Sequence, residues 1–262
     1  MAWDCFDIST SGGVAHLRLS RPERRNAMTE AFWRELPAAV KALEADAGVR
    51  VLVLSSTGPH FSAGLDLALF QGSQALGTGS VEARLRFRAK LEELQGSLHA
   101  LAEARFPVIA AIQGGCIGGG VDMATACCLR YATTDAWFVI QEINLGMMAD
   151  VGTFNRMPKQ LPEAVVRELG YTGDKLSAER AERLGFVNGL FGNHEALVAG
   201  ALAVAARIAA KAPVAVAATK QMISYTRDHG VAESFAYLNA LQPGIFDIEA
   251  IHAALSSRRS TK

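Results

Sequence analysis

Short apolar runs recur through the first half of the chain and predict buried strands. They are rich in β-branched and aliphatic residues and lie at Val14–Leu19, Val51–Leu54, Val108–Ile112 and Trp137–Ile140. A further run, Phe6–Ser9, is separated from Val14–Leu19 by the pair Gly12-Gly13. Two extended runs on either side of a glycine pair predict a hairpin.

Helical patterns fill the spaces between these runs. Apolar residues at helical spacing predict a helix that is capped by Thr29 and continues to about Ala45. A second, longer amphipathic pattern covers Val81–Arg105. Strands that alternate with helices predict a mostly parallel sheet covered by helices, which defines an α/β fold.

The last third of the chain is almost entirely helical in pattern. Ser177 is a candidate N-cap for a short helix that stops at Gly185, and helical spacing continues from His194 onward. We therefore predict an α/β core at residues 1–193 that contains the functional site. Residues 194–262 are predicted to form a helical region that packs on the core and takes part in oligomer contacts.

Gln71–Ser80 is the one low-complexity stretch, rich in Gly, Ser and Gln. Such a composition is typical of a mobile surface loop. Because the stretch directly follows a candidate binding turn, it is equally compatible with a lid over a pocket. The sequence leaves both interpretations open.

Composition and charge are those of a globular protein. Among 262 residues, 26 Lys and Arg balance 26 Asp and Glu, and 50% are apolar. Zero net charge argues against a nucleic-acid partner, which needs a basic excess, and the basic stretches Arg21–Arg25 and Arg258–Arg259 are short. No run reaches the roughly 18 apolar residues of a membrane helix, so no membrane partner is expected.

Neither end of the sequence carries a targeting pattern. Met1–Thr10 holds two Asp and no basic segment of the kind that opens a secretory signal. The final residues, Ser260-Thr261-Lys262, do not match a peroxisomal address. We therefore expect a cytoplasmic location.

Cysteines and histidines do not predict a metal site. The four cysteines, none in a C-x-x-C pair, are read as reduced core residues: Cys5, Cys116, Cys127 and Cys128. The six histidines are scattered without ligand spacing. Neither a metal ion nor a redox cofactor is expected.

Three carboxylates stand in unusually apolar or glycine-rich surroundings, namely Asp122, Glu142 and Asp150. Each has a structural explanation by itself: Asp122 in a first helical turn would favour the helix dipole, and Asp150 could cap a helix that starts near Val151. Three such acids within 29 residues are harder to explain structurally. We therefore take them as candidate catalytic groups, although the sequence does not show that they converge.

Two glycine turns could supply backbone N–H donors. Gly115–Gly120 follows a predicted strand and opens an apolar helix pattern, so its amides are placed to bind an anion or a developing oxyanion. It lacks the Lys-Ser/Thr of a phosphate loop and the second glycine of a dinucleotide fingerprint. An acid beside an oxyanion site points to proton transfer at a carbonyl compound. Phe61–Leu67 could supply a second donor.

These motifs together resemble the enoyl-CoA hydratase/isomerase (crotonase) superfamily. The resemblance rests on Phe61-Ser62-Ala63-Gly64-x-Asp66-Leu67 and Gly114–Gly120, supported by Arg21-Pro22-x-x-x-Asn26-Ala27 and Pro107–Ile112. The set Asp122, Glu142 and Asp150 is similar to that of the dienoyl-CoA isomerase branch. The resemblance implies a spiral of ββα units with a helical C-terminal region, assembled as trimers or a dimer of trimers.

The resemblance also implies an activity: conversion of 3,5-dienoyl-CoA to 2,4-dienoyl-CoA in fatty acid β-oxidation, through a thioester dienolate. It assigns the proton transfers to Glu142 and Asp150, with Asp150 as the preferred starting base, while Asp122 orients the diene or tunes the pair. The N–H groups of Ala63 and Gly119 would hold the thioester oxygen. Coenzyme A enters only as part of the acyl-CoA substrate. The implied substrate-binding residues are Ala63, Gly64, Leu65, Asp66, Leu67 and Gly119.

Other activities in the superfamily remain open. Enoyl-CoA hydration needs two acids around one water, and Asp at position 122 is one methylene shorter than the Glu of hydratases, which argues against it. A monoene isomerase is a second alternative. A non-catalytic acyl-CoA- or RNA-binding member is a third, and the zero net charge disfavours RNA.

Overall fold

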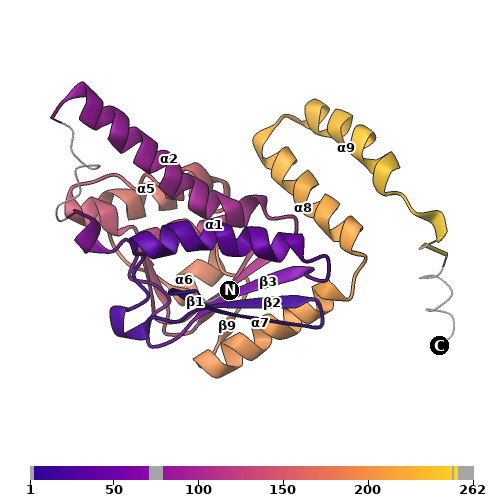
Figure 1. Cartoon of the computed structure of the whole chain (residues 1–262), viewed down its shortest axis with the longest axis horizontal. Helices are drawn as coiled ribbons and strands as arrows, with labels where there is room; N and C mark the ends of the chain where they lie inside the picture. The colour runs from indigo at the N-terminus through magenta and orange to yellow at the C-terminus, as the bar shows by residue number, and fades with distance from the viewer. Residues whose placement is uncertain (1–2, 71–78, 250, 253–262) are drawn as a thin grey trace. The chain divides into compact units, whose positions relative to one another are not determined.

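The computed structural model describes residues 3–70, 79–249 and 251–252 (Figure 1). The strands are β1 (Phe6–Ser11), β2 (Val14–Leu19), β3 (Val51–Ser56), β4 (Val108–Ile112), β5 (Gly115–Ile117), β6 (Leu129–Thr133), β7 (Trp137–Val139), β8 (Leu176–Ser177) and β9 (Leu190–Phe191). The helices are α1 (Glu30–Ala45), α2 (Val81–Glu103), α3 (Gly119–Ala126), α4 (Thr153–Arg156), α5 (Glu163–Thr172), α6 (Ala178–Arg183), α7 (His194–Ala209), α8 (Pro213–Asp228) and α9 (Val231–Ile245). Short 3-10 turns cover Pro22–Arg24, Leu67–Phe70, Gln141–Leu145 and Met157–Lys159.

Two sheets form the framework. The larger sheet has the strand order β1-β2-β3-β4-β6-β9, and the smaller one has the order β5-β7-β8. The β1–β2 pair is the predicted antiparallel hairpin, with Phe6 opposite Leu19, and the remaining pairs of the larger sheet are parallel. The α/β core with a mostly parallel sheet is therefore as predicted.

Successive residues of a strand point to opposite faces of the larger sheet, and a core cluster packs on each face. In β3, Leu52 and Leu54 belong to a core cluster that includes side chains of α1 and α2. Val51 and Val53 belong to a separate cluster that contains the small apolar face of α7, formed by Leu197, Ala201, Ala205 and Ala209. This two-sided burial explains why β3 appears in the sequence as a continuous apolar run.

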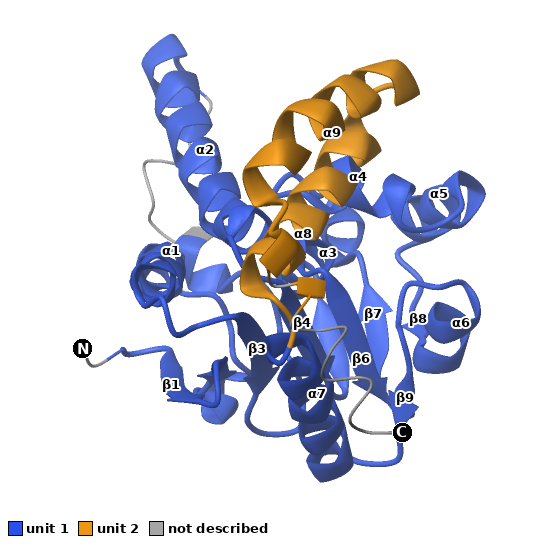
Figure 2. Cartoon of the chain, turned by 90° about the vertical axis from the view of Figure 1, so that its right-hand side faces the viewer, with its two compact units in different colours: residues 1–210 blue, residues 211–262 orange. Residues whose placement is uncertain are grey.

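The chain divides into two compact units, residues 1–210 and 211–262, which Figure 2 colours separately. The division lies later than the predicted boundary between 193 and 194, because the buried face of α7 belongs to the first unit. The second unit contains α8 and α9. Within the described ranges no single helix is long and apolar enough to cross a membrane, and α7 and α8 reach that length and hydropathy only when counted together across the break between them.

Local signals placed several helix starts correctly. The Thr29 and Ser177 hydroxyls accept the amides of Phe32 and Arg180, and so cap α1 and α6. The structural alternative for Asp150, a cap for a helix that starts near Val151, does not apply, because α4 begins at Thr153 with Gly152 at its N-cap.

The prediction of four core cysteines is wrong for one of them. Cys5, Cys116 and Cys127 are buried, whereas Cys128 is exposed, and the structure shows no disulfide among these four described residues. The candidate loop or lid at Gln71–Ser80 lies outside the described residues except for its last two positions, where Ser80 caps α2.

Candidate active site

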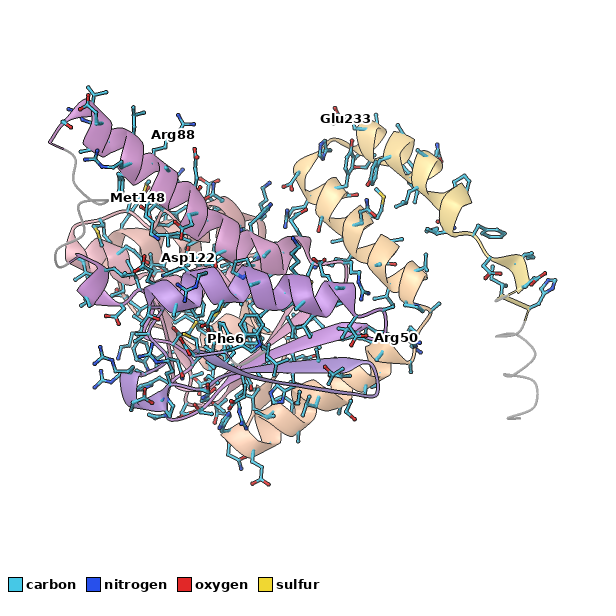
Figure 3. All side chains as sticks on the ribbon, in the orientation of Figure 1. Phe6, Arg50, Arg88, Asp122, Met148 and Glu233 are labelled. Carbon is cyan, nitrogen blue, oxygen red and sulfur yellow. The ribbon has the colours of Figure 1, made fainter. Side chains whose placement is uncertain are left out.

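Three carboxyl groups that are far apart in the sequence line one cavity of about 200 Å³. Asp122 comes from the first turn of α3, Glu142 from the 3-10 turn after β7, and Asp150 from the loop before α4. Figure 3 marks Asp122 and Met148 among the lining side chains. Most of the remaining wall is apolar, formed by Trp33, Leu65, Leu67, Phe87, Leu91, Leu94, Leu145, Met147, Met148 and Val151. The structure thus brings together the three acids that the sequence singled out.

Asp122 is the most deeply buried of the three, with 1% of its surface exposed. Its Oδ1 atom accepts the Thr153 amide across 2.6 Å. Burial raises its pKa from 3.8 to about 6, the Thr153 hydrogen bond opposes that rise, and the charge of Asp150 adds to it. One oxygen of Asp122 is therefore hydrogen-bonded to the main chain three residues after Asp150.

Glu142 lines the cavity with a carboxyl group of which one oxygen is unsatisfied. Its Oε2 atom is buried and has no hydrogen-bond partner among the described residues. Burial, followed by the charge of Asp122, raises the pKa of Glu142 from 4.5 to about 7. A carboxyl in this state is protonated in a substantial fraction of molecules near neutral pH and can then donate its proton to a bound molecule.

Asp150 is half-buried, and this burial raises the pKa of its carboxyl above 3.8. It is less enclosed than Asp122 and Glu142. At neutral pH the cavity can therefore hold Asp150 ionised and Glu142 protonated, and this is the state that proton transfer between two carboxyls requires. Asp150 and Glu142 also interact electrostatically, because the charge of Asp150 is one cause of the raised pKa of Glu142.

The two glycine turns meet in backbone contact beside these acids. A Cβ atom added to Gly64, where φ is +79°, would lie 2.5 Å from the Ile117 carbonyl oxygen and 2.9 Å from the Gly119 nitrogen. Only glycine fits such an approach. The Gly119 amide opens α3 and has no backbone partner within the part of the chain that the structure describes. The turn that the sequence analysis singled out thus offers an N–H without a backbone partner in the described chain and a favourable helix dipole.

The second predicted donor, Ala63, is not free in this structure. Its amide donates to the Arg25 carbonyl across 2.9 Å, as part of the contact between the loop and the turn after β2. The Leu65 amide, by contrast, has no hydrogen bond in the described chain, and its nitrogen lies 3.4 Å from the position of a Cβ added to Gly119. The available amide pair is therefore Leu65 and Gly119, which corrects the assignment of Ala63.

Some of the predicted substrate-binding residues line the cavity and others do not. Ala63, Leu65 and Leu67 line the cavity, as does Gly119. Gly64 and Asp66 are not among its described lining residues. Gly64 allows the close backbone approach described above, and the Asp66 carboxylate pairs with Arg24 across 3.8 Å.

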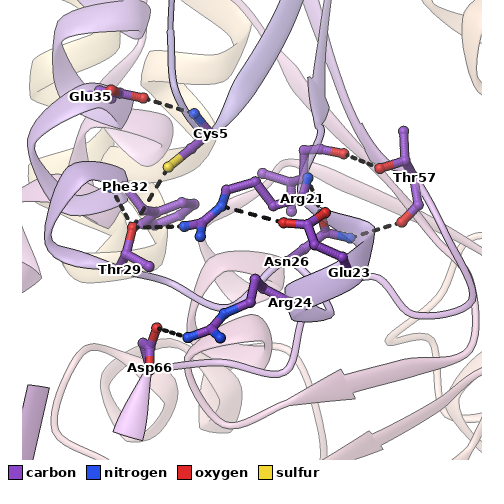
Figure 4. Close-up of polar contacts among 11 residues, drawn as sticks. Cys5, Arg21, Glu23, Arg24, Asn26, Thr29, Phe32, Glu35, Thr57 and Asp66 are labelled. Atoms are coloured by element: carbon purple, nitrogen blue, oxygen red, sulfur yellow. Dashed lines mark hydrogen bonds and ion pairs between the residues drawn. The ribbon is translucent and has the colours of Figure 1, made fainter. Parts of the chain in front are cut away.

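Asn26 explains why the Arg-Pro-x-x-x-Asn motif accompanies this site (Figure 4). It is buried with φ at +52°, a conformation that asparagine tolerates better than most residues. The Asn26 Nδ2 atom donates to the carbonyls of Thr57 and His60 at 2.9 and 3.1 Å. The Ser62 hydroxyl donates to the main-chain carbonyl of Asn26 at 2.9 Å. Asn26 therefore holds the start of the loop that leads to the Leu65 amide.

Sequence reasoning missed the contribution of α2 to the cavity. Phe87, Lys90, Leu91 and Leu94 line it at the i, i+3, i+4, i+7 spacing of one helical face. Lys90 pairs with the more exposed Glu93 across 2.9 Å. Helical periodicity identified the face, but only the tertiary fold shows that part of it borders a cavity. No group of His, Cys, Asp and Glu suited to a metal occurs within the described ranges.

Comparisons with known proteins show the family of the chain. The sequence profile of the family described as enoyl-CoA hydratase/isomerase matches residues 9–252. The mitochondrial Delta(3,5)-Delta(2,4)-dienoyl-CoA isomerase of Homo sapiens is 41% identical over 228 residues, which cover 86% of this chain and 70% of the human protein. Its peroxisomal counterpart in Arabidopsis thaliana is 35% identical over 253 residues, which cover 95% of this chain and 91% of that protein.

A solved structure of an enoyl-CoA hydratase has the same fold. The crystal structure of an enoyl-CoA hydratase from Polaromonas sp. JS666 matches with a TM-score of 0.87 at 26% identity, covering 98% of this chain and 97% of the other. The predicted crotonase-type fold is confirmed. The chain belongs to the enoyl-CoA hydratase/isomerase family.

Proposed function

We propose that this protein is an acyl-CoA isomerase that converts 3,5-dienoyl-CoA to 2,4-dienoyl-CoA. The observation that carries the proposal is the pairing of Asp150 with Glu142, whose pKa is raised to about 7, in one apolar cavity beside two free amides. The likeness to dienoyl-CoA isomerases supports it. Such a reaction serves the breakdown of unsaturated fatty acids.

The amides of Leu65 and Gly119 receive the thioester oxygen of the substrate. Negative charge develops on that oxygen when a proton leaves C2, and preorganised N–H donors stabilise it. Removing one such donor costs roughly 2.7–4 kcal/mol in related chemistry. Because both donors are main-chain groups held by the contact between two glycine turns, they need no rearrangement during the reaction.

The two carboxyls move the protons. Ionised Asp150 takes the C2 proton, and the electron pair of that bond enters a dienolate that extends to C6. Protonated Glu142 then supplies a proton at C6, which leaves double bonds at C2–C3 and C4–C5. Protons balance, and the two acids exchange states. The apolar wall excludes the water that would otherwise compete for these protons.

Asp122 supports this pair and does not hold a water. Its Oδ1 is occupied by the Thr153 amide, and its charge helps keep Glu142 protonated. Hydration needs two acids that share one water above the double bond. An Asp turned toward the main chain is poorly suited to that task, which is why we favour isomerisation over hydration.

The direct test is to supply purified protein with 3,5-dienoyl-CoA and with 2-enoyl-CoA and to follow diene conjugation and hydration by absorbance. We expect conjugation of the diene. Asp150→Asn and Glu142→Gln should each lower kcat by roughly 10²–10⁴-fold. Matched changes at exposed acids, Asp135→Asn and Glu179→Gln, should have no effect. Fast hydration without diene conjugation would show a hydratase instead, and acyl-CoA or RNA binding without turnover would show a non-catalytic member.

We also propose a homotrimer or a dimer of trimers. The second unit exposes several large apolar side chains, which are Val214, Ile223, Val231, Phe235, Phe246, Ile248 and Ile251. Exposed apolar groups at this density are typical of an interface. Sedimentation equilibrium tests the assembly, and a monomer at micromolar concentration would contradict it. The cytoplasmic location stays a prediction, to be tested by cell fractionation, since the relatives above are mitochondrial and peroxisomal proteins.

A further inference from the structure

A glutamine on α2 holds the main chain of Asp150. The Gln95 Nε2 atom donates to the Asp150 carbonyl oxygen across 2.7 Å, a short and well-formed bond between residues 55 apart in sequence. Gln95 is half-buried, and it follows Leu94, which lines the cavity. The bond therefore joins the wall of the cavity to the residue that carries the base.

The donor comes from a firmly anchored helix. Within one turn of Gln95, the side chains of Leu94 and Leu98 are buried in the main core, and Leu101 follows them. The acceptor, in contrast, lies in a loop without helix or strand pairing. The position of Asp150 is consequently set by its neighbours and not by its own secondary structure.

A second side chain holds the same loop from the opposite end. Asp122 on α3 accepts the Thr153 amide at 2.6 Å, three residues beyond the carbonyl that Gln95 binds. The segment 150–153 is thus fastened at its first carbonyl by α2 and at its last amide by α3. The Asp122 bond alone would leave the Asp150 end of the segment able to swing.

We propose that Gln95 is a positioning residue for Asp150, an inference that rests on the proposed isomerase function. Gln95 touches no reacting atom. It keeps the Asp150 carboxyl at the correct distance from the acyl chain and partly shielded from water. A base displaced by about 1 Å can cost on the order of 10²-fold in rate. A base released into solvent also returns toward its ordinary, lower pKa.

The test compares three variants of the full-length protein by steady-state kinetics with 3,5-dienoyl-CoA, pH profiles and thermal unfolding. Gln95→Met keeps the length of the side chain and removes the donor. Gln95→Lys keeps an N–H donor of similar reach. Gln160→Met is the matched control, because Gln160 donates in the same way to the Thr125 carbonyl at 2.9 Å, and neither residue lines the cavity.

Gln95→Met should lower kcat by about 10-fold to 100-fold with less than about a 3-fold change in KM, and should move the acidic limb of the kcat profile to lower pH. Gln95→Lys should recover most of the lost kcat. Gln160→Met should lose about as much thermal stability as Gln95→Met does. It should keep the wild-type kcat and pH profile.

Several results would overturn the inference. One is a Gln95→Met variant with the wild-type kcat and pH profile. Another is a loss of kcat in Gln95→Met that Gln160→Met matches. A third is a Gln95→Lys variant that folds and has a kcat no higher than that of Gln95→Met. If the wild-type protein fails to isomerise the diene, the proposed function fails and this inference fails with it. An active wild type with an indifferent Gln95 rejects the inference alone.

Discussion

The Thr153 amide donates to Asp122 Oδ1 across 2.6 Å, so a buried acid of the cavity serves as an anchor for the chain that carries the base. This contact separates Asp122 from the two other carboxyls. Glu142 has a buried oxygen with no partner in the described chain, and Asp150 is the most accessible of the three. Asp122 therefore has a structural role, whereas Glu142 and Asp150 are the two acids available for reaction.

Asp122→Asn should stabilise the protein at neutral and alkaline pH. Asn can still accept the Thr153 amide, while the buried charge is removed. The carboxyl titrates at 3.8 when unfolded and at about 6 when folded, so the folded state binds more protons between these values and wild-type stability falls as pH rises through them. Urea unfolding at about pH 8 should show a gain of about 1–3 kcal/mol that disappears near pH 4. A gain that is the same at both pH values would contradict this account.

The pH profile of kcat/KM should have an alkaline limb near pH 7. Activity requires Glu142 protonated, and its pKa is raised to about 7 by burial and by the charge of Asp122. The acidic limb reflects protonation of Asp150. Asp122→Asn removes a charge that supports the raised pKa, and should move the alkaline limb to lower pH, whereas Asp135→Asn should not. An alkaline limb that is unchanged in Asp122→Asn would show that Glu142 is not the group observed.

Gly119→Ala should damage turnover more than stability. The added methyl would lie 2.9 Å from the Met28 sulfur and 3.4 Å from the Leu65 nitrogen, where it obstructs the approach to both amides. We expect kcat/KM to fall by roughly 10²–10³-fold. Gly96→Ala is the matched control, because a methyl there meets nothing within 4 Å on the exposed side of α2. It should add about 0.5–1 kcal/mol of stability and leave the kinetics unchanged. Equal kinetics for the two variants would place the oxyanion site elsewhere.

Asn26→Asp should destabilise the fold through the turn that carries Leu65. The change removes the Nδ2 donor from the Thr57 and His60 carbonyls and places a buried carboxylate beside them. We expect a loss of about 2 kcal/mol or more at neutral pH, smaller in acid where the new carboxyl is protonated. The control is Asn193→Asp, where an exposed N-cap keeps its acceptor for Ala196. Thermal unfolding of both variants across pH measures the loss of stability in each. An Asn26→Asp variant as stable as the wild type would contradict the role of Asn26 in holding the turn.

Much of the fold could be predicted because its signals are local. The Thr29 cap, the Gly12-Gly13 hairpin and the buried run of β3 each reflect contacts within a few residues or a simple alternation of faces. β6 was missed for a physical reason. It contains Arg130, whose guanidinium is buried against the Phe186 ring and donates to main-chain carbonyls, so a charged residue interrupts the apolar pattern of an interior strand.

The site was predicted less completely. The three acids stood out by their surroundings, and the resemblance to a known family grouped them, but spacing alone could not show that they share a cavity. The choice between the Ala63 and Leu65 amides depends on whether the Arg25 carbonyl occupies one of them, which is a tertiary fact. Gln95 carries no sequence signal, because a glutamine in an amphipathic helix is ordinary until its partner is known.

The groups assigned to the thioester oxygen belong to the main chain at Leu65 and Gly119. Amides of this kind survive any change of side chain that preserves the path of the backbone. Position 65 can therefore drift toward larger or smaller apolar residues and alter which acyl groups fit, while the polarisation of the carbonyl is inherited unchanged. Divergence in substrate range among relatives that share this backbone can thus proceed without rebuilding the chemistry.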